Sequence, residues 1–327
     1  MPDILALCSP DDIEKMYKVT SANPVRDGFQ SLKKVRDETK DNYFEQKSGL
    51  LPENHDEWWR VRSRVQTPMM KQRNLFQYLP QMDQISREFL DRIAQLQKEN
   101  GEMPSSFLQE IYKWSLESVG LVALNRRFGC LDPNIKADSS QLQLIKTVND
   151  IFKYLNITEM ALQLWKYFPT PSYKKLKAGH DVFFRIADTH IREAESEVMA
   201  RNSKPGAGDH ESTLLEVLLK KEGLNRSDVV TIILDMLFAG IDTTAHTIAF
   251  TLYLLARNPS AQKRVQEEVD SVLGAGKEAI TDKHLQRLSF LKCCIKESLR
   301  YVKIPPMFHI ILGMNMKYLK KHLFKYN

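Results

Sequence analysis

Hydrophobic residues recur at helical spacing along most of this chain, whereas the alternating pattern of strands is scarce. Pro10–Lys15 is typical of a helix start, Arg201–Asp209 of a loop, and Gly274–Gly276 of a turn. A short apolar run at Ile4–Cys8 is consistent with a strand. The spacing predicts amphipathic helices at about 55–72, 78–99, 105–125, 140–155, 174–201, 213–222, 259–273 and 282–300.

The longest apolar run is predicted to form a single helix over about residues 227–257. Asn225 can cap its first turn, with Asp228 three residues later. At 1.5 Å per residue the helix is roughly 45 Å long, enough to cross a whole domain. Because Asp235 and Asp242 interrupt the apolar sequence, the helix is a poor membrane span and fits a core helix.

A polar motif lies in the middle of this run. Ala239, Asp242, Thr243 and His246 follow the three-to-four spacing, so they share one face of the helix. Gly240 lets a flat ligand approach the backbone and lets the helix bulge, at a cost of about 1 kcal/mol relative to alanine. The alternative is structural, since a buried helix tolerates an occasional glycine and such polar groups can hydrogen-bond within a core.

Composition excludes several classes of protein. The chain has 327 residues with 43% hydrophobic content, which is ample for a core. Its net charge of +6 is mild and its acids are interleaved with bases, which does not favour a nucleic-acid binder. Residues 1–7 lack the basic leader and the apolar length of a signal peptide. The four cysteines show no metal-binding spacing and two are adjacent, which favours a reducing compartment.

Trp58 and Arg62 form a second candidate site. They are four residues apart, so an indole N–H and a guanidinium point the same way from one helical turn. Together they suit a carboxylate at the edge of a large planar ligand. The alternative is that the tryptophan packs in a core and the arginine stacks or stays solvated.

A third motif lies near the end of the last predicted helix. Glu297 and Arg300 are spaced to form an i,i+3 ion pair, and Lys292 and Lys296 share a neighbouring face. The alternative for the pair is an ordinary surface salt bridge worth a few tenths of a kcal/mol.

Taken together, in this order, the three motifs resemble the cytochrome P-450 family of haem-thiolate monooxygenases. Trp58 and Arg62 match its W-x-x-x-R helix, residues 239–244 match its A-G-x-D-T-T helix, and Glu297 with Arg300 matches its E-x-x-R. The resemblance covers roughly residues 1–300. It implies a mainly α fold with a small β portion, and haem as the cofactor.

The resemblance also implies roles for single residues. Trp58 and Arg62 are expected to bind a haem propionate, with Ala239 and Gly240 also in the cofactor-binding part. Asp242 and Thr243 are expected to deliver protons during oxygen activation. The glutamate and arginine of E-x-x-R are expected to lock the structure behind the haem.

The segment L-K-x-x-I-K-E-S-L-R resembles the mitochondrial class of the family, where Lys292 and Lys296 are expected to dock an acidic, adrenodoxin-like ferredoxin. Charge complementarity of this kind raises encounter rates more than affinity. Stretches 114–119 and 164–171 resemble insect members of the class. The resemblance implies the matrix side of the mitochondrial inner membrane, peripheral membrane association, and a lipophilic substrate, either a steroid or a foreign compound.

The chain departs from the family after Arg300, where no F-x-x-G-x-x-x-C-x-G loop follows. None of Cys8, Cys130, Cys293 or Cys294 lies in a comparable setting, so no axial metal ligand is assigned. We therefore expect a fold incomplete at both ends, without its leader, and an aberrant, disordered basic tail at 301–327. As it stands, the chain is expected to be inactive.

Two rival interpretations belong to other classes. One is a non-catalytic helical interaction protein, or a truncated relic without haem, that keeps Lys292 and Lys296 as a docking patch. The other is nucleic-acid binding through the lysines of residues 317–325, which fit a solvated or disordered end better.

Overall fold

The computed structural model describes residues 7–20, 24–26, 28–40, 43–45, 47–97, 103–203, 212–274 and 279–301. Within these ranges the chain folds into α-helices and short 3₁₀ segments, with no strand, which confirms the predicted mainly α class. The strand expected at Ile4–Cys8 lies mostly outside the described residues, and the two residues that are described, Leu7 and Cys8, are not in a strand. The predicted basic tail lies outside them from residue 302 onward.

The helical elements follow one another along the chain. They are α1 (Pro10–Thr20), α2 (Gln30–Asp37), α3 (His55–Met70), α4 (Gln72–Phe76), α5 (Leu79–Leu96), α6 (Phe107–Leu124), α7 (Ser140–Met160), η2 (Leu164–Lys166), α8 (Pro171–Asn202), α9 (Leu214–Leu219), α10 (Arg226–Ala256), α11 (Pro259–Leu273), α12 (Asp282–Arg287) and α13 (Ser289–Tyr301).

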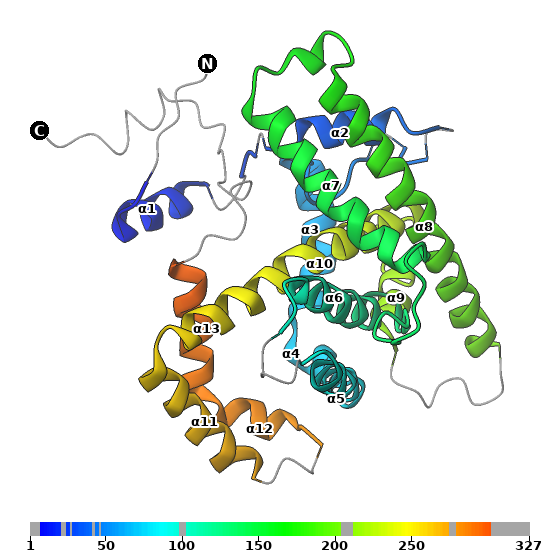
Figure 1. Cartoon of the computed structure of the whole chain (residues 1–327). Helices are drawn as coiled ribbons and strands as arrows, with labels where there is room; N and C mark the ends of the chain where they lie inside the picture. Colours follow the sequence, from blue (N-terminus) through cyan, green and yellow to red (C-terminus); the bar gives the residue numbers. More distant parts are fainter. Residues whose placement is uncertain are drawn as a thin grey trace, which may run out of the picture.

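Helix α10 is the central element, and it crosses the middle of the molecule with α6 packed beside it (Figure 1). The predicted cap is present: the Asn225 side chain accepts from the Asp228 amide at 2.8 Å, and the Asp228 carboxylate accepts from the Asn225 amide at 2.9 Å. By length and composition α10 could cross a membrane, but 67% of its most apolar window is buried inside the fold. It is therefore built as a core helix.

The other helices surround α10 on several sides. Helices α7 and α8 lie side by side as a long pair, and α11, α12 and α13 gather near the C-terminal end of α10 (Figure 1). Phe152 of α7 stacks on Phe238 of α10, with ring centroids 4.3 Å apart, and Phe183 of α8 meets the same ring edge-on. This aromatic contact ties the long pair to the core.

The helix prediction was wrong in several details, and it also omitted the short helix α4. The helix expected over 282–300 is broken at Leu288, whose ψ of 65° ends α12 before α13 begins. Helix α2 was missed because its eight residues are too few to establish a periodicity. Leu32, Val35 and Arg36 of α2 are nonetheless buried.

Candidate functional site

Helices α6 and α10 cross at the glycine of the central motif. A Cβ on Gly240 would lie 2.7 Å from a methyl carbon of Val119 on α6, so only glycine allows this approach without rearrangement. The Ser115 hydroxyl on α6 lies 3.0 Å from the carbonyl oxygen of Gly240 and 2.8 Å from that of Ile241. The glycine therefore has a packing role here, beside the ligand-approach role expected from the sequence.

Asp242 points toward the same helix. The Tyr112 hydroxyl donates to Asp242 Oδ1 at 3.0 Å, and His246 Nδ1 lies 3.4 Å from Asp242 Oδ2. Burial and the Asp242 charge together raise the pKa of Tyr112, so this hydroxyl stays a donor. Sequence reasoning placed His246 on this face but missed Tyr112, which carries no motif.

The stripe formed by Ala239, Gly240 and Thr243 is only partly buried, whereas residues 229–235 of the same helix are all buried. Thr243 Oγ1 donates to the Ala239 carbonyl oxygen at 2.7 Å, which holds the hydroxyl close to the helix backbone. Small side chains and an open face leave room for a flat ligand against this part of α10.

On α3, Trp58 and Arg62 lie one turn apart and are both partly buried, as their spacing predicts. The structure adds Arg26, whose guanidinium carbon lies 5.5 Å from the centroid of the Trp58 ring. Burial, with a further contribution from nearby Arg62, lowers the pKa of Arg26. Within the described part of the chain, Arg26 Nε is buried without a hydrogen-bond partner. These donors together suit a carboxylate that is not part of this chain.

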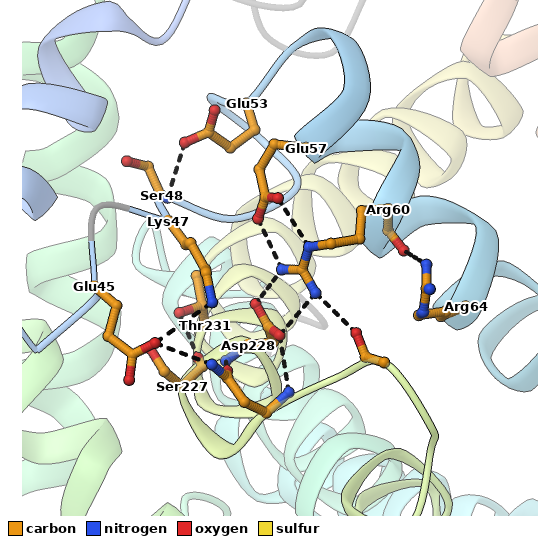
Figure 2. A network of polar contacts seen from close by, with 12 residues as sticks. Glu45, Lys47, Ser48, Glu53, Glu57, Arg60, Arg64, Ser227, Asp228 and Thr231 are labelled. Carbon is orange, nitrogen blue, oxygen red and sulfur yellow. Dashed lines mark hydrogen bonds and ion pairs between the residues drawn. The ribbon is translucent and has the colours of Figure 1, made fainter.

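Helix α3 is fixed to the beginning of α10 by a polar network (Figure 2). Arg60 donates to Glu57 at 2.8 Å and 2.7 Å, to Asp228 Oδ2 at 3.0 Å, and to the Gly223 carbonyl oxygen at 2.8 Å. The carboxylates of Glu57 and then Asp228 raise the pKa of Arg60, so the clamp stays charged. The face that carries Trp58 is thereby held in a fixed relation to α10.

Asp235 forms a second link at the N-terminal half of α10. Arg36 Nη2 donates to Asp235 Oδ1 at 2.7 Å, and the Leu51 amide donates to Oδ2 at 3.3 Å. The neighbouring Leu50 carbonyl accepts from Arg26 Nη2 at 2.8 Å. Burial raises the pKa of Asp235, while the Arg36 charge opposes this rise. Residues 50 and 51 therefore connect the Arg26 donors to the α10 face that carries Asp242.

On α13, Glu297 and Arg300 form the predicted pair, with Arg300 Nε 2.7 Å from Glu297 Oε2. Both side chains are mostly exposed, at 60% and 70%. The hydrogen bond from Arg300 lowers the pKa of Glu297. Lys292 and Lys296 are exposed on the same helix, and Lys292 Nζ donates to the Gln286 carbonyl oxygen at 3.4 Å. In the described part of the molecule the E-x-x-R pair is thus a surface salt bridge.

The cysteines lie in unrelated settings. Cys8 and Cys293 are exposed, Cys294 is partly buried, and Cys130 is buried next to Glu117. Burial raises the pKa of the Cys130 thiol, which disfavours a thiolate there. Among the described residues no group of three or more His, Cys, Asp or Glu side chains is placed to hold a metal ion.

A family model for cytochrome P450 matches residues 3–311. The chain belongs to the cytochrome P450 family. "Probable cytochrome P450 12b2, mitochondrial" of Drosophila melanogaster is 33% identical over 306 residues, which cover 93% of this chain and 55% of the relative. "Cytochrome P450 CYP12A2" of Musca domestica is 31% identical over 302 residues, covering 91% and 56%. This cytochrome P450 chain therefore spans about half the length of the curated relatives it matches.

The family binds haem, and the residues present fit that group. Haem is a flat macrocycle with two carboxylates, and the open stripe of α10 offers a flat face. Arg26 Nε, which has no hydrogen-bond partner among the described residues, lies in a cluster of donors with Trp58 and Arg62. This match rests on the donor set and the small side chains of the P450 chain itself.

Proposed function

We propose that this chain belongs to a mitochondrial haem monooxygenase that hydroxylates an apolar substrate with dioxygen and with electrons from a ferredoxin. The observation that carries the proposal is the buried Asp242 next to Thr243 on a half-open, small-residue stripe of α10. An acid and a hydroxyl at such a face can move protons toward a bound ligand.

The residues divide the work. Trp58, Arg62 and Arg26 hold propionates, while Ala239 and Gly240 leave room for the ring. Bound haem supplies dioxygen activation and the oxidising power, which is chemistry that side chains lack. The Asp242 carboxylate takes up and releases protons within the core. Thr243 passes these protons on at the open face. The substrate class is lipophilic, either a steroid or a foreign compound.

The proposal is tested with a hybrid protein. Residues 1–300 are joined to the segment of the Musca domestica relative that lies C-terminal to its matched region. The reduced hybrid is expected to show a carbon-monoxide difference band at about 450 nm, the signature of thiolate-ligated haem in this family. Trp58→Phe with Arg62→Met is expected to weaken haem retention, whereas Trp59→Phe, a change at an exposed neighbour, is the matched control.

The rival interpretation is a non-catalytic helical protein without haem, and it predicts a different result. A folded, helical hybrid that gives no band at about 450 nm would support the rival and contradict the proposal. The unmodified chain is expected to bind haem weakly and to show no such band. A band from the chain alone means that one of its own cysteines ligates iron.

The ferredoxin site is proposed on Lys292 and Lys296, which are exposed and one turn apart on α13. Two ammonium groups on one face suit an acidic partner at a small, transient contact. Lys292→Glu with Lys296→Glu is expected to weaken ferredoxin binding and to flatten its salt dependence in calorimetric titrations. Lys283→Glu, at an exposed lysine of α12, is the control. Equal binding by both variants at low salt contradicts the docking site.

Peripheral membrane contact is proposed for the connection between α7 and α8. Leu162, Tyr167 and Phe168 are 71%, 86% and 53% exposed there, and Lys166 lies beside them. Apolar and aromatic tips with a neighbouring lysine suit an interface with anionic lipid headgroups. Leu162→Ser with Phe168→Ser is expected to reduce co-flotation with anionic vesicles. Met199→Ser, at an equally exposed apolar residue of α8, is expected to leave flotation unchanged.

A further inference from the structure

Asp242 is a buried acid with a titratable neighbour that reaches solvent. Its side chain is 7% exposed, and the side chain of His246, one turn later on α10, is 30% exposed. A carboxylate in this position exchanges protons with bulk water slowly unless another group carries them. Histidine is the side chain whose charge changes near neutral pH.

The geometry joins three groups around this carboxylate. Tyr112 donates to Asp242 Oδ1 at 3.0 Å. His246 Nδ1 lies 3.4 Å from Oδ2 and 3.0 Å from the Asp242 carbonyl oxygen. The His246 ring meets Tyr112 edge-on with centroids 5.8 Å apart, and it stacks on Phe250 at 6.1 Å. Each carboxylate oxygen therefore has its own partner, one of which can titrate near neutral pH and one of which cannot.

We propose that His246 replenishes the proton of Asp242 from solvent, while Tyr112 fixes the orientation of the carboxylate during that exchange. The inference rests on the proposed function, because it extends the proton path of Asp242 and Thr243 to the protein surface. Both residues act through Asp242 and touch no reacting atom, so they are positioning residues.

The proton balance is simple. A solvent proton binds Nε2 of the neutral ring and gives an imidazolium, which then passes the Nδ1 proton to Asp242 Oδ2. One N–H bond breaks and one O–H bond forms. The carboxylic acid gives its proton onward toward Thr243 and returns to a carboxylate. The ring, now protonated on Nε2, returns to its Nδ1–H form by tautomerisation through solvent, in which Nε2 gives its proton to water and Nδ1 takes one up, and no electron is transferred.

Electrostatics favour this arrangement. The hydrogen bond to Asp242, opposed by partial burial, raises the pKa of His246 above its ordinary value of 6.5. In the described part of the fold, the charge that acts on His246 comes from Asp242, and the titratable group that faces it from α6 is Tyr112. The imidazolium is thus populated near neutral pH, where a proton source is useful.

Tyr112 keeps the path directional. Its raised pKa means that it donates to Oδ1 without titrating, which leaves Oδ2 as the oxygen that faces His246. Phenylalanine at this position removes the donor and frees the carboxylate to rotate. Glutamine at position 246 keeps a donor but does not titrate.

The first test uses the chain as it exists. Proteins carrying ¹³C-labelled histidine are titrated by NMR, and the His246 signal is assigned by its loss in His246→Gln. The His246 pKa is expected to lie above that of an exposed histidine and to fall in Asp242→Asn. A His246 titration that Asp242→Asn leaves unchanged overturns the inference, whatever the hybrid shows about haem.

The second test uses the haem-loaded hybrid and its pH profile. Coupling, meaning product formed per electron pair consumed, is expected to fall in the parent as pH rises through the His246 pKa. In His246→Gln, coupling is expected to be independent of pH over that range. At the acid end it is expected to be about threefold or more below that of the parent. His284→Gln, at a histidine of α12, is the control and is expected to keep the parent profile. A His246→Gln profile that follows the parent overturns the proton-exchange role, whereas failure of the proposed function appears separately as a missing band at about 450 nm.

Discussion

Two buried aspartates seven residues apart on α10 have been given different partners. Asp235 is paired with the buried guanidinium of Arg36 and accepts a backbone amide, so its charge is matched by a permanent cation. Asp242 is paired with a neutral hydroxyl and with His246, a base that titrates. A permanently charged partner makes a carboxylate a structural anchor. A partner that titrates can exchange a proton with the carboxylate.

The surroundings reinforce the difference. Gly49 approaches Asp235 so closely that a Cβ would lie 2.8 Å from Oδ2, and its φ of +90° favours glycine. At Asp242 the neighbouring face is partly exposed, and Thr243 lies beside it. The N-terminal half of the helix is therefore closed around its acid, and the central part is open.

The largest expected effect concerns the anchor. Arg36→Met leaves the Asp235 carboxylate buried without its cation, which is expected to lower the free energy of unfolding by about 3–5 kcal/mol. Arg36→Met with Asp235→Leu is expected to recover at least half of that loss, because the buried charge is removed as well. Urea unfolding at neutral pH measures both. A double variant no more stable than the single one would mean that the pair is not what holds this region.

A second effect on stability follows from His180, whose pKa is influenced by the charge of Arg36. Its two ring nitrogens are buried and, in the described part of the chain, have no partner. Burial and then the Arg36 charge hold the pKa of His180 well below 6.5. The unfolded state therefore takes up a proton first as pH falls below 6.5.

Native stability is accordingly expected to drop below pH 6.5 by up to about 1.4 kcal/mol per pH unit from this residue. His180→Leu is expected to remove that part of the slope. Urea unfolding of parent and variant between neutral and mildly acid pH measures the difference. Parallel curves for the two proteins contradict the buried neutral histidine.

A smaller effect on stability is expected at Asp242. Tyr112→Phe removes one hydrogen bond to Asp242 and is expected to cost about 1–1.5 kcal/mol of unfolding free energy. Tyr253→Phe, at an exposed tyrosine of α10, is the control and is expected to change stability by less than about 0.5 kcal/mol. Thermal unfolding measures both. A Tyr112→Phe loss as large as that of Arg36→Met would erase the contrast between the two acids.

The smallest effect is the pH-dependent part of the His246 contact. Because the folded pKa of His246 is raised, its stabilisation is full below 6.5 and disappears as pH rises through the folded pKa. Allowing for partial solvent screening, the free energy of unfolding of the parent is expected to exceed that of His246→Gln by about 1 kcal/mol or less at acid pH. The difference is expected to shrink at alkaline pH. A difference that grows with pH contradicts the assigned sign.

Much of the helical framework follows from the sequence. Apolar spacing predicted α10 with its cap at Asn225 and Asp228, because local hydrogen bonds and periodicity decide where such a helix begins. The short helix α2 and the break at Leu288 were not predicted, because helices of six or eight residues carry too little periodic signal. The predictions about the family were carried by motifs, and the family match over residues 3–311 confirms the membership.

The partners of the site residues were decided by the tertiary structure. Spacing along one helix placed Asp242 with Thr243 and Trp58 with Arg62, because residues three or four apart share a face. Nothing local links Tyr112 or Arg26 to those residues, since they come from other parts of the chain. Which hydroxyl or guanidinium meets a buried carboxylate depends on how helices pack, and that follows from burial of apolar surface summed over the whole chain.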